Sequence, residues 1–238
     1  MIQIPYLKNH KNKKQKITLQ EGLDKMKLQQ EIENLNQMVI KMADMVEENL
    51  KISFDLLSEY SDKKACLIND DIVDLHERLV EEMSMSIMLK ERPYASDMRM
   101  VLGILKLVED IERLGDHAED IRDFSKKISQ TDPCKIEKLD QAVNFALKMV
   151  HNSMHSFISK DLELAQQTIH DDDIIDALYE EMISELISKL DQKIISSSCA
   201  IYYTLVIKYI ERIADHASNI AEWVIYILLG YHKDKQIF

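Results

Sequence analysis

The sequence contains very little glycine and proline, the residues that most often mark turns and interrupt helices. Only 4 Gly and 3 Pro occur in 238 residues, whereas hydrophobic residues make up 46% of the chain. Turns rely on Gly and Pro, and long helices avoid them, so this composition predicts few, long helices and almost no strand. The chain is long enough for one large domain or two small ones.

Cysteine is also scarce, and long hydrophobic runs are missing. Cys66, Cys134 and Cys199 are odd in number and widely spaced, with no CxxC or zinc-ligand spacing. We therefore expect three reduced thiols in a cytoplasmic protein. The most apolar stretches, 199–207 and 223–229, fall well short of the roughly 20 residues that span a bilayer. No transmembrane helix is expected.

Positive charge is missing from most of the chain, whose net charge is −12. Residues 1–20 are the exception, because they are polar, lack helical periodicity and contain no acid before residue 21. We expect them to form a flexible basic arm. Its five lysines are Lys8, Lys11, Lys13, Lys14 and Lys16. The remaining body is strongly acidic, so it should attract cations and repel nucleic acid and anionic membranes.

Recognisable catalytic motifs are absent as well. The sequence has no Gly-rich phosphate loop, no GxSxG and no HExxH. The Glu-x-x-His motif of di-iron helical bundles is also missing. We therefore predict that the protein is not an enzyme. A metal-dependent hydrolase built on a helical bundle is the enzymatic alternative, and it lacks a nucleophile or base beside its acidic residues.

Helical periodicity fills most of the chain after residue 20, because apolar residues recur at spacings of three and four. Pro93 suits the first turn of a helix, Asp161 suits an N-cap and Gly230 suits a C-cap. The stretch Thr131-Asp132-Pro133 separates two halves. The expected helices run over about 23–60, 62–90, 93–129, 136–159, 161–191 and 196–230.

The two halves repeat each other. Val108–Phe124 reads VEDIERLGDHAEDIRDF, Ile207–Trp223 reads IKYIERIADHASNIAEW, and seven aligned positions are identical. DDIVDL at Asp70–Leu75 and DDIIDA at Asp172–Ala177 repeat at nearly the same offset. Duplication of this kind indicates one supersecondary unit used twice.

The predicted fold is therefore all-α, with two tandem three-helix bundles. The domains are expected to be the basic arm (1–20), a first bundle (21–130) and a second bundle (131–238).

Each half carries two pairs of acidic residues spaced four apart. Residues i and i+4 of a helix lie on one face, with Cβ atoms about 5–6 Å apart. If the two helices that carry the pairs face each other, four carboxylates converge and a multivalent cation would relieve their repulsion. The pairs are Asp70/Asp74 and Glu112/Asp116 in the first half, and Asp172/Asp176 and Glu211/Asp215 in the second.

Such acid pairs are also common on solvated helix faces, so an acidic surface without metal is the alternative. His117 and His216 directly follow the motif aspartates, but each lies about 100° around the helix from its Asp. This placement favours a structural role between helices. Arg113 and Arg212 are expected to pair with acids on a neighbouring helix.

The stretches LVEDIERLGDHAEDI and IERIADHASNIAEWVIYILLG resemble the third-helix signatures of the two repeats of the PhoU family. The resemblance covers about residues 24–231. It implies two three-helix bundles related by pseudo-two-fold symmetry. It also implies a regulator of phosphate homeostasis that restrains phosphate-starvation signalling and phosphate uptake.

The same resemblance implies partners and a cofactor. The family's partners are a membrane sensor histidine kinase and the ATPase subunit of a phosphate ABC transporter, and a homodimer is expected. Some members hold iron or zinc clusters on paired E(D)xxxD motifs, which correspond to the eight carboxylates named above; manganese and magnesium also suit oxygen ligands. The leading hypothesis is thus a regulatory adaptor with metal-binding acidic motifs. The alternative is a metal-free helical interaction or chaperone-like module.

Overall fold

The structure is a computed structural model that describes residues 5–91, 93–233 and 235–236, with side chains described for 22–91 and 93–233. Helices dominate it, as predicted. Seven helices and one short hairpin are described: α1 (Pro5–Ser58), α2 (Asp62–Ala65), α3 (Asp70–Lys90), α4 (Ala95–Ile128), α5 (Leu139–Ser159), α6 (Leu162–Asp191), α7 (Ser197–Leu229), β1 (Tyr231–His232) and β2 (Lys235–Gln236). The two strands pair antiparallel.

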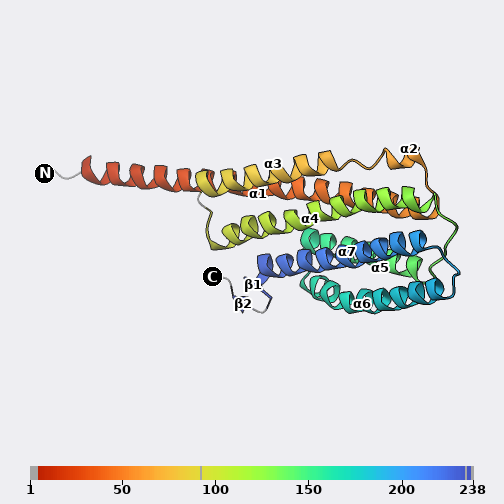
Figure 1. Cartoon of the computed structure of the whole chain (residues 1–238). Coiled ribbons are helices and arrows are strands. Elements are labelled where there is room, and N and C mark those ends of the chain that lie inside the picture. The colour runs from red at the N-terminus through yellow and green to blue at the C-terminus, as the bar shows by residue number, and fades with distance from the viewer. Residues whose placement is uncertain (1–4, 92, 234, 237–238) are drawn as a thin grey trace.

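The six long helices lie side by side and form two groups of three (Figure 1). Helices α1, α3 and α4 pack on one another in the first group, and α5, α6 and α7 do so in the second. Between the groups, α4 packs against α7 and α1 against α5. Equivalent helices of the two sequence repeats therefore face each other, which confirms the predicted tandem bundles.

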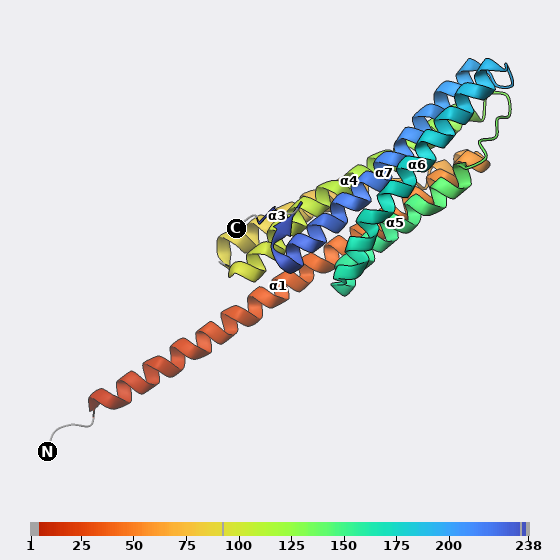
Figure 2. The ribbon, with the colours of Figure 1, turned by 90° about the horizontal axis from the view of Figure 1, so that it is seen from below.

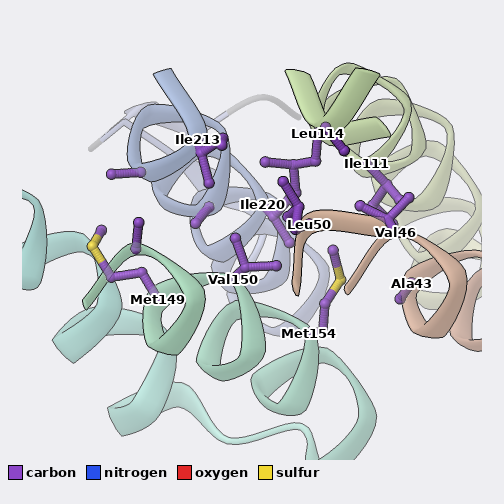
Figure 3. Close-up of a cluster of buried hydrophobic side chains, with 14 of the residues drawn as sticks. Ala43, Val46, Leu50, Ile111, Leu114, Met149, Val150, Met154, Ile213 and Ile220 are labelled. Atoms are coloured by element: carbon purple, nitrogen blue, oxygen red, sulfur yellow. The ribbon is translucent and has the colours of Figure 1, made fainter. Parts of the chain in front are cut away.

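The two bundles share one hydrophobic core (Figure 3). Leu50 of α1, Leu114 of α4, Val150 of α5 and Ile213 of α7 are all fully buried. They belong to a single cluster of buried apolar residues that runs from α1 to α7. Since both repeats contribute to this cluster, they are two halves of one packed body.

Several predicted helix ends are confirmed. The Asp161 carboxylate accepts a hydrogen bond of 3.0 Å from the backbone N–H of Leu164 and so caps α6. Gly230 ends α7 in the left-handed conformation, with φ of 83°. Pro93 is one position where the prediction was wrong. It precedes α4, which begins only at Ala95, after Tyr94 in extended backbone.

The second predicted helix is divided in the structure. The short α2 ends at Ala65, and α3 begins at Asp70. Ala65 and Ile68 pack with Leu56 in a small cluster of buried residues apart from the main core. Burying these side chains turns the chain and interrupts the helix. As a result, Asp70 lies in the first turn of α3, where the helix dipole favours negative charge.

The first helix is longer than predicted, because α1 begins at Pro5 and includes most of the segment expected to be an irregular arm. Its N-terminal part projects well beyond the other helices (Figure 2). The side chains of 5–21, and residues 1–4 entirely, lie outside the described residues, so the mobility expected for 1–20 stays a prediction. Across the part of the chain that the structure describes, no helix is both long and apolar enough to cross a membrane.

Candidate functional site

The first predicted set of four carboxylates comes together between α3 and α4. Asp70 and Asp74 lie on the early turns of α3, and Glu112 and Asp116 lie on the middle of α4. The charges of Asp116, Asp74 and Glu112 all act on the Asp70 carboxyl group. All four side chains are half-buried. We call these residues the first acidic cluster.

Gly115 allows α3 to approach α4 at this cluster. A Cβ atom at position 115 would lie 2.6 Å from Oδ1 of Asp70 and 3.2 Å from Cγ1 of Val73. Only a residue without a side chain therefore fits between the two helices here. The equivalent residue in the second repeat is Ala214, which carries the Cβ atom that Gly115 lacks.

Burial in the first acidic cluster opposes ionisation. Burial, together with the neighbouring charges of Asp116 and Asp74, raises the pKa of Asp70 to about 7. Burial and, after it, the charge of Asp116 raise the pKa of Glu112 to about 7. The Oδ1 atom of Asp70 is buried and has no hydrogen-bond partner. The cluster therefore holds acceptor oxygens whose negative charge is poorly compensated.

The second acidic cluster lies between α6 and α7. Asp172 and Asp176 come from α6, and Glu211 and Asp215 come from α7. Burial, and then the charges of Asp215 and Asp176, raise the pKa of Asp172 to about 6. Asp176 and Asp215 are exposed, so this cluster is more open to solvent than the first.

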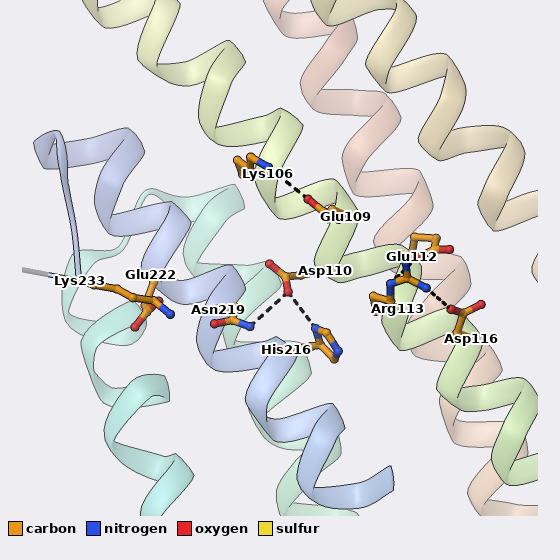
Figure 4. Close-up of polar contacts among 10 residues, drawn as sticks. All are labelled: Lys106, Glu109, Asp110, Glu112, Arg113, Asp116, His216, Asn219, Glu222 and Lys233. Atoms are coloured by element: carbon orange, nitrogen blue, oxygen red, sulfur yellow. Dashed lines mark hydrogen bonds and ion pairs between the residues drawn. The ribbon is translucent and has the colours of Figure 1, made fainter. Parts of the chain in front are cut away.

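Basic side chains already neutralise part of each cluster. Arg113 pairs with Asp116 at 2.8 Å and with Glu112 at 3.4 Å (Figure 4). Lys208 pairs with Glu211 at 2.6 Å. The expectation that Arg113 pairs across helices was therefore wrong. A carboxylate three residues away on the same helix is already within reach of its guanidinium group.

The residue types in the two clusters suit a cation, but their side chains are not arranged around a common binding point. Clustered carboxylate oxygens are the ligands that hard divalent cations prefer. An unpaired buried oxygen on Asp70 gives such an ion something to bind. However, among the residues with described side chains, no three Asp, Glu, His or Cys side chains are arranged to hold a metal ion. Binding would require the carboxylates to turn toward one another and Arg113 to move away.

A polar contact links the two repeats next to these clusters. Nδ1 of His216 on α7 donates to Oδ1 of Asp110 on α4 at 2.8 Å, and Asn219 donates to the same oxygen at 3.3 Å (Figure 4). His117 packs against the rings of Tyr209 and His216. Both histidines thus lie between α4 and α7, which confirms their predicted structural placement.

Sequence reasoning missed Asp110 and Gly115. Both differ between the aligned repeats, where Tyr209 and Ala214 stand at the equivalent positions. Identities between the repeats indicate the acidic pairs and leave these two positions unmarked. The glycine in the middle of a helix was the available signal, because such a residue commonly marks a close approach.

A model of the PhoU domain matches the chain twice, over residues 39–124 and 139–224. Each match covers one of the two bundles and includes the acidic motif of its last helix.

Whole proteins resemble the chain over most of its length. A phosphate-specific transport system accessory protein PhoU homolog from Aquifex aeolicus is 34% identical over 190 residues, covering 79% of this chain and 86% of that protein. A protein of the same description from Clostridium acetobutylicum is 27% identical over 208 residues, covering 86% and 95%. The crystal structure of PhoU from Pseudomonas aeruginosa is similar with a TM-score of 0.81 and 26% identity, covering 85% of this chain and 99% of that one.

Proposed function

The chain belongs to the PhoU family, and from this membership we propose that it is a regulatory accessory protein of a phosphate transport system. The observation that carries the proposal is the match of the PhoU domain to both bundles. Relatives that share most of its length are named as accessory proteins of phosphate-specific transport. The chain is an accessory protein and not an enzyme.

Its role in this proposal is that of a cytoplasmic adaptor that lowers phosphate uptake and phosphate-starvation signalling when phosphate is plentiful. Its partners are the ATPase subunit of a phosphate ABC transporter and a membrane sensor histidine kinase, and it acts as a homodimer. The long helices lie side by side and offer extended faces to more than one partner, which supports an adaptor role. Ile72, Leu75 and Leu79, spaced three and four apart on α3, form an exposed apolar stripe suited to such contacts.

Cation binding at the two acidic clusters is part of the same proposal. Asp70, Asp74, Glu112 and Asp116 would hold one ion or cluster, and Asp172, Asp176, Glu211 and Asp215 another. Iron or zinc is proposed first, with manganese and magnesium next, because carboxylate oxygens bind all of them. The bound charge would offset the burial and the mutual repulsion that together raise the pKa of Asp70 and Glu112 to about 7. It would thereby join α3 to α4, and α6 to α7.

A genetic test measures the regulatory role. The protein is expressed in a bacterium that lacks its own family member, and uptake of radioactive phosphate is measured in phosphate-rich medium. We expect uptake to fall by several-fold, together with expression of a phosphate-starvation reporter. The full chain with Gly103→Leu, which should disrupt contact between α4 and α7, is the folding-defective control. Unchanged uptake with a well-expressed wild-type chain would contradict the proposal.

A metal-free interaction module is the second candidate. The pairing of Arg113 with Glu112 and Asp116, and of Lys208 with Glu211, favours it, because these cations already offset part of the negative charge. Elemental analysis of protein purified without a histidine tag separates the two. Metal at or above one ion per chain supports the cation clusters, and metal-free protein that still lowers uptake supports the module.

A further inference from the structure

Two histidine rings meet at the interface between the repeats, and neither belongs to the acidic clusters. His117 of α4 and His216 of α7 occupy equivalent positions in the two repeats. Their ring centroids lie 5.3 Å apart, with 47° between the ring planes. The two rings thus bring nitrogen donors from both halves of the molecule to one place.

The surroundings of the two rings are not equivalent. His216 is oriented by Asp110, which accepts from its Nδ1 at 2.8 Å. His117 has no such carboxylate. The residue equivalent to Asp110 in the second repeat is Tyr209, and its ring centroid lies 5.2 Å from that of His117. Both ring nitrogens of His117 are buried without a hydrogen-bond partner, and the residue as a whole is only 7% exposed. A buried polar group left without a partner is costly, which makes it a candidate for binding something.

An open cavity of about 740 Å³ lies beside both rings. Its wall includes three basic residues, Arg113, Arg212 and Lys233, against five acidic ones, among them Asp116 and Asp215. Two of the basic groups are already paired, Arg113 with Asp116 and Lys233 with Glu222. The cavity is thus net acidic, so its charge favours a cation over an anion.

We propose that His117 and His216 together bind one divalent transition-metal ion, such as Zn²⁺, at the interface between the repeats. Its ligands differ from the eight carboxylates of the acidic clusters, although Asp116, Asp172 and Asp215 line the same cavity. The His216 side chain donates Nδ1–H to Asp110, which leaves its Nε2 lone pair available. A carboxylate behind a histidine in this way is typical of metal ligands.

The spacing of the rings suits a shared ion. Zn–N bonds of about 2.0–2.1 Å with tetrahedral angles place the centroids of two imidazole ligands about 5 Å apart. The observed separation is 5.3 Å. Water completes the coordination, in keeping with the lack of any group of three protein ligands among the described side chains. Imidazole nitrogen selects Zn²⁺, Ni²⁺ or Cu²⁺ over Mg²⁺, so this site and the carboxylate clusters differ in their preferred ion.

The test measures Zn²⁺ binding by NMR of the full chain labelled with ¹⁵N at histidine. The background carries His151→Gln and His155→Gln, because these exposed histidines lie one turn apart on α5, with rings 6.0 Å apart, and form a competing pair. We expect the imidazole ¹⁵N signals of His117 and His216 to shift together at one Zn²⁺ per site. Adding His117→Gln should weaken the Zn²⁺ affinity of His216 by about tenfold or more.

Two further variants keep the result interpretable. Asp110→Asn removes the carboxylate that orients His216 and should weaken Zn²⁺ binding while both imidazoles remain. Asp74→Asn with Asp176→Asn removes one carboxylate from each acidic cluster, and neither residue lines the cavity. That double variant should keep the histidine shifts, even if the clusters bind no metal. Histidine signals that stay unmoved in millimolar Zn²⁺, or an affinity unchanged by His117→Gln in protein with wild-type circular dichroism, would overturn the proposal.

Discussion

At the scale of single residues, the carboxyl groups of the first acidic cluster are buried in a way that disfavours their charged form. Asp70 and Glu112 have pKa values raised to about 7, chiefly because they are buried. Both also experience the charge of Asp116. The folded protein therefore binds protons at these sites more tightly than the unfolded chain, which makes its stability depend on pH.

Metal-free protein should lose stability as the pH rises from about 4 to about 8. The pKa of Asp70 is raised on folding from 3.8 to about 7, so its stabilising proton is fully present below pH 3.8 and is lost as the pH passes through 7. Asp70→Asn should flatten this slope and raise the melting temperature at pH 8 by roughly 2–4 °C, which corresponds to about 1 kcal/mol.

Thermal unfolding in the presence of a chelator, at pH 5, 6, 7 and 8, measures this slope. The matched control is Asp71→Asn, which removes an exposed carboxylate from the same turn of α3. Parallel curves for Asp70→Asn and wild type would show that the Asp70 carboxyl group is not responsible for the pH dependence.

Asp116→Asn should abolish the metal-dependent stabilisation of the first cluster and leave that of the second. An ion that binds only the folded state adds about 2.7 kcal/mol at a hundredfold excess over its dissociation constant. Without metal, the variant should be at least as stable as wild type, because Asp116 is a repulsive charge toward Asp70 and Glu112.

Differential scanning calorimetry with and without Mn²⁺, Fe²⁺, Zn²⁺ or Mg²⁺ tests this prediction, with Asp215→Asn as the counterpart in the second cluster. Each single variant should lose part of the shift that wild type shows, and the double variant should lose all of it. If wild type melts at one temperature with and without every ion, the cation clusters are excluded and the adaptor function remains.

At the scale of helices, the packing of α4 depends on its two glycines. Gly115 brings α3 close at the first acidic cluster, whereas Gly103 brings α7 close near its C-terminal end. A Cβ atom at position 103 would overlap Cγ1 of Ile227. The same helix thus uses one small residue toward its own bundle and another toward the second repeat.

Gly103→Ala should destabilise the protein by roughly 1–3 kcal/mol, because the added methyl group must displace the Ile227 side chain from a close-packed interface. Gly22→Ala is the matched control on α1, where a Cβ atom meets nothing within 4 Å. That substitution should be neutral or stabilise by about 0.5–1 kcal/mol, since Ala favours helix. Urea unfolding gives both values, and equal destabilisation by the two variants would refute the packing argument.

At the scale of the whole molecule, the described core begins at Leu28 and includes residues of both repeats. The part of α1 that comes before it extends past the other helices (Figure 2). The chain therefore combines one packed body with a basic helical extension. The two parts differ in charge, because the extension is rich in lysine and the body is acidic.

Removing residues 1–20 should change the free energy of unfolding by no more than about 0.5 kcal/mol, because the start of α1 extends past the other helices (Figure 2). Phosphate-uptake control should weaken if the basic segment contacts an acidic partner or membrane surface. Calorimetry and the uptake assay on the shortened protein separate these effects. A fall of many degrees would instead make residues 1–20 part of the folded body.

The sequence by itself determined the helical class, the duplication and the main helix ends. Apolar spacing of three and four residues dictates which helix faces are buried, and Asp161 and Gly230 act through local backbone geometry. The approach of the acidic pairs was predicted on the condition that the helices carrying them face each other, and the packing of α3 on α4 and of α6 on α7 meets that condition. These features depend on neighbours within a few residues or on a pattern repeated in the chain.

Only the tertiary structure decided the break between α2 and α3 and the environment of His117. The break arises because Ala65 and Ile68 pack on Leu56, away from the main core. His117 lacks a hydrogen-bond partner because Tyr209 stands where the other repeat has Asp110. Such features depend on which side chains from different helices meet in the folded molecule. A pattern within one helix carries no information about the residue that a different helix brings to face it.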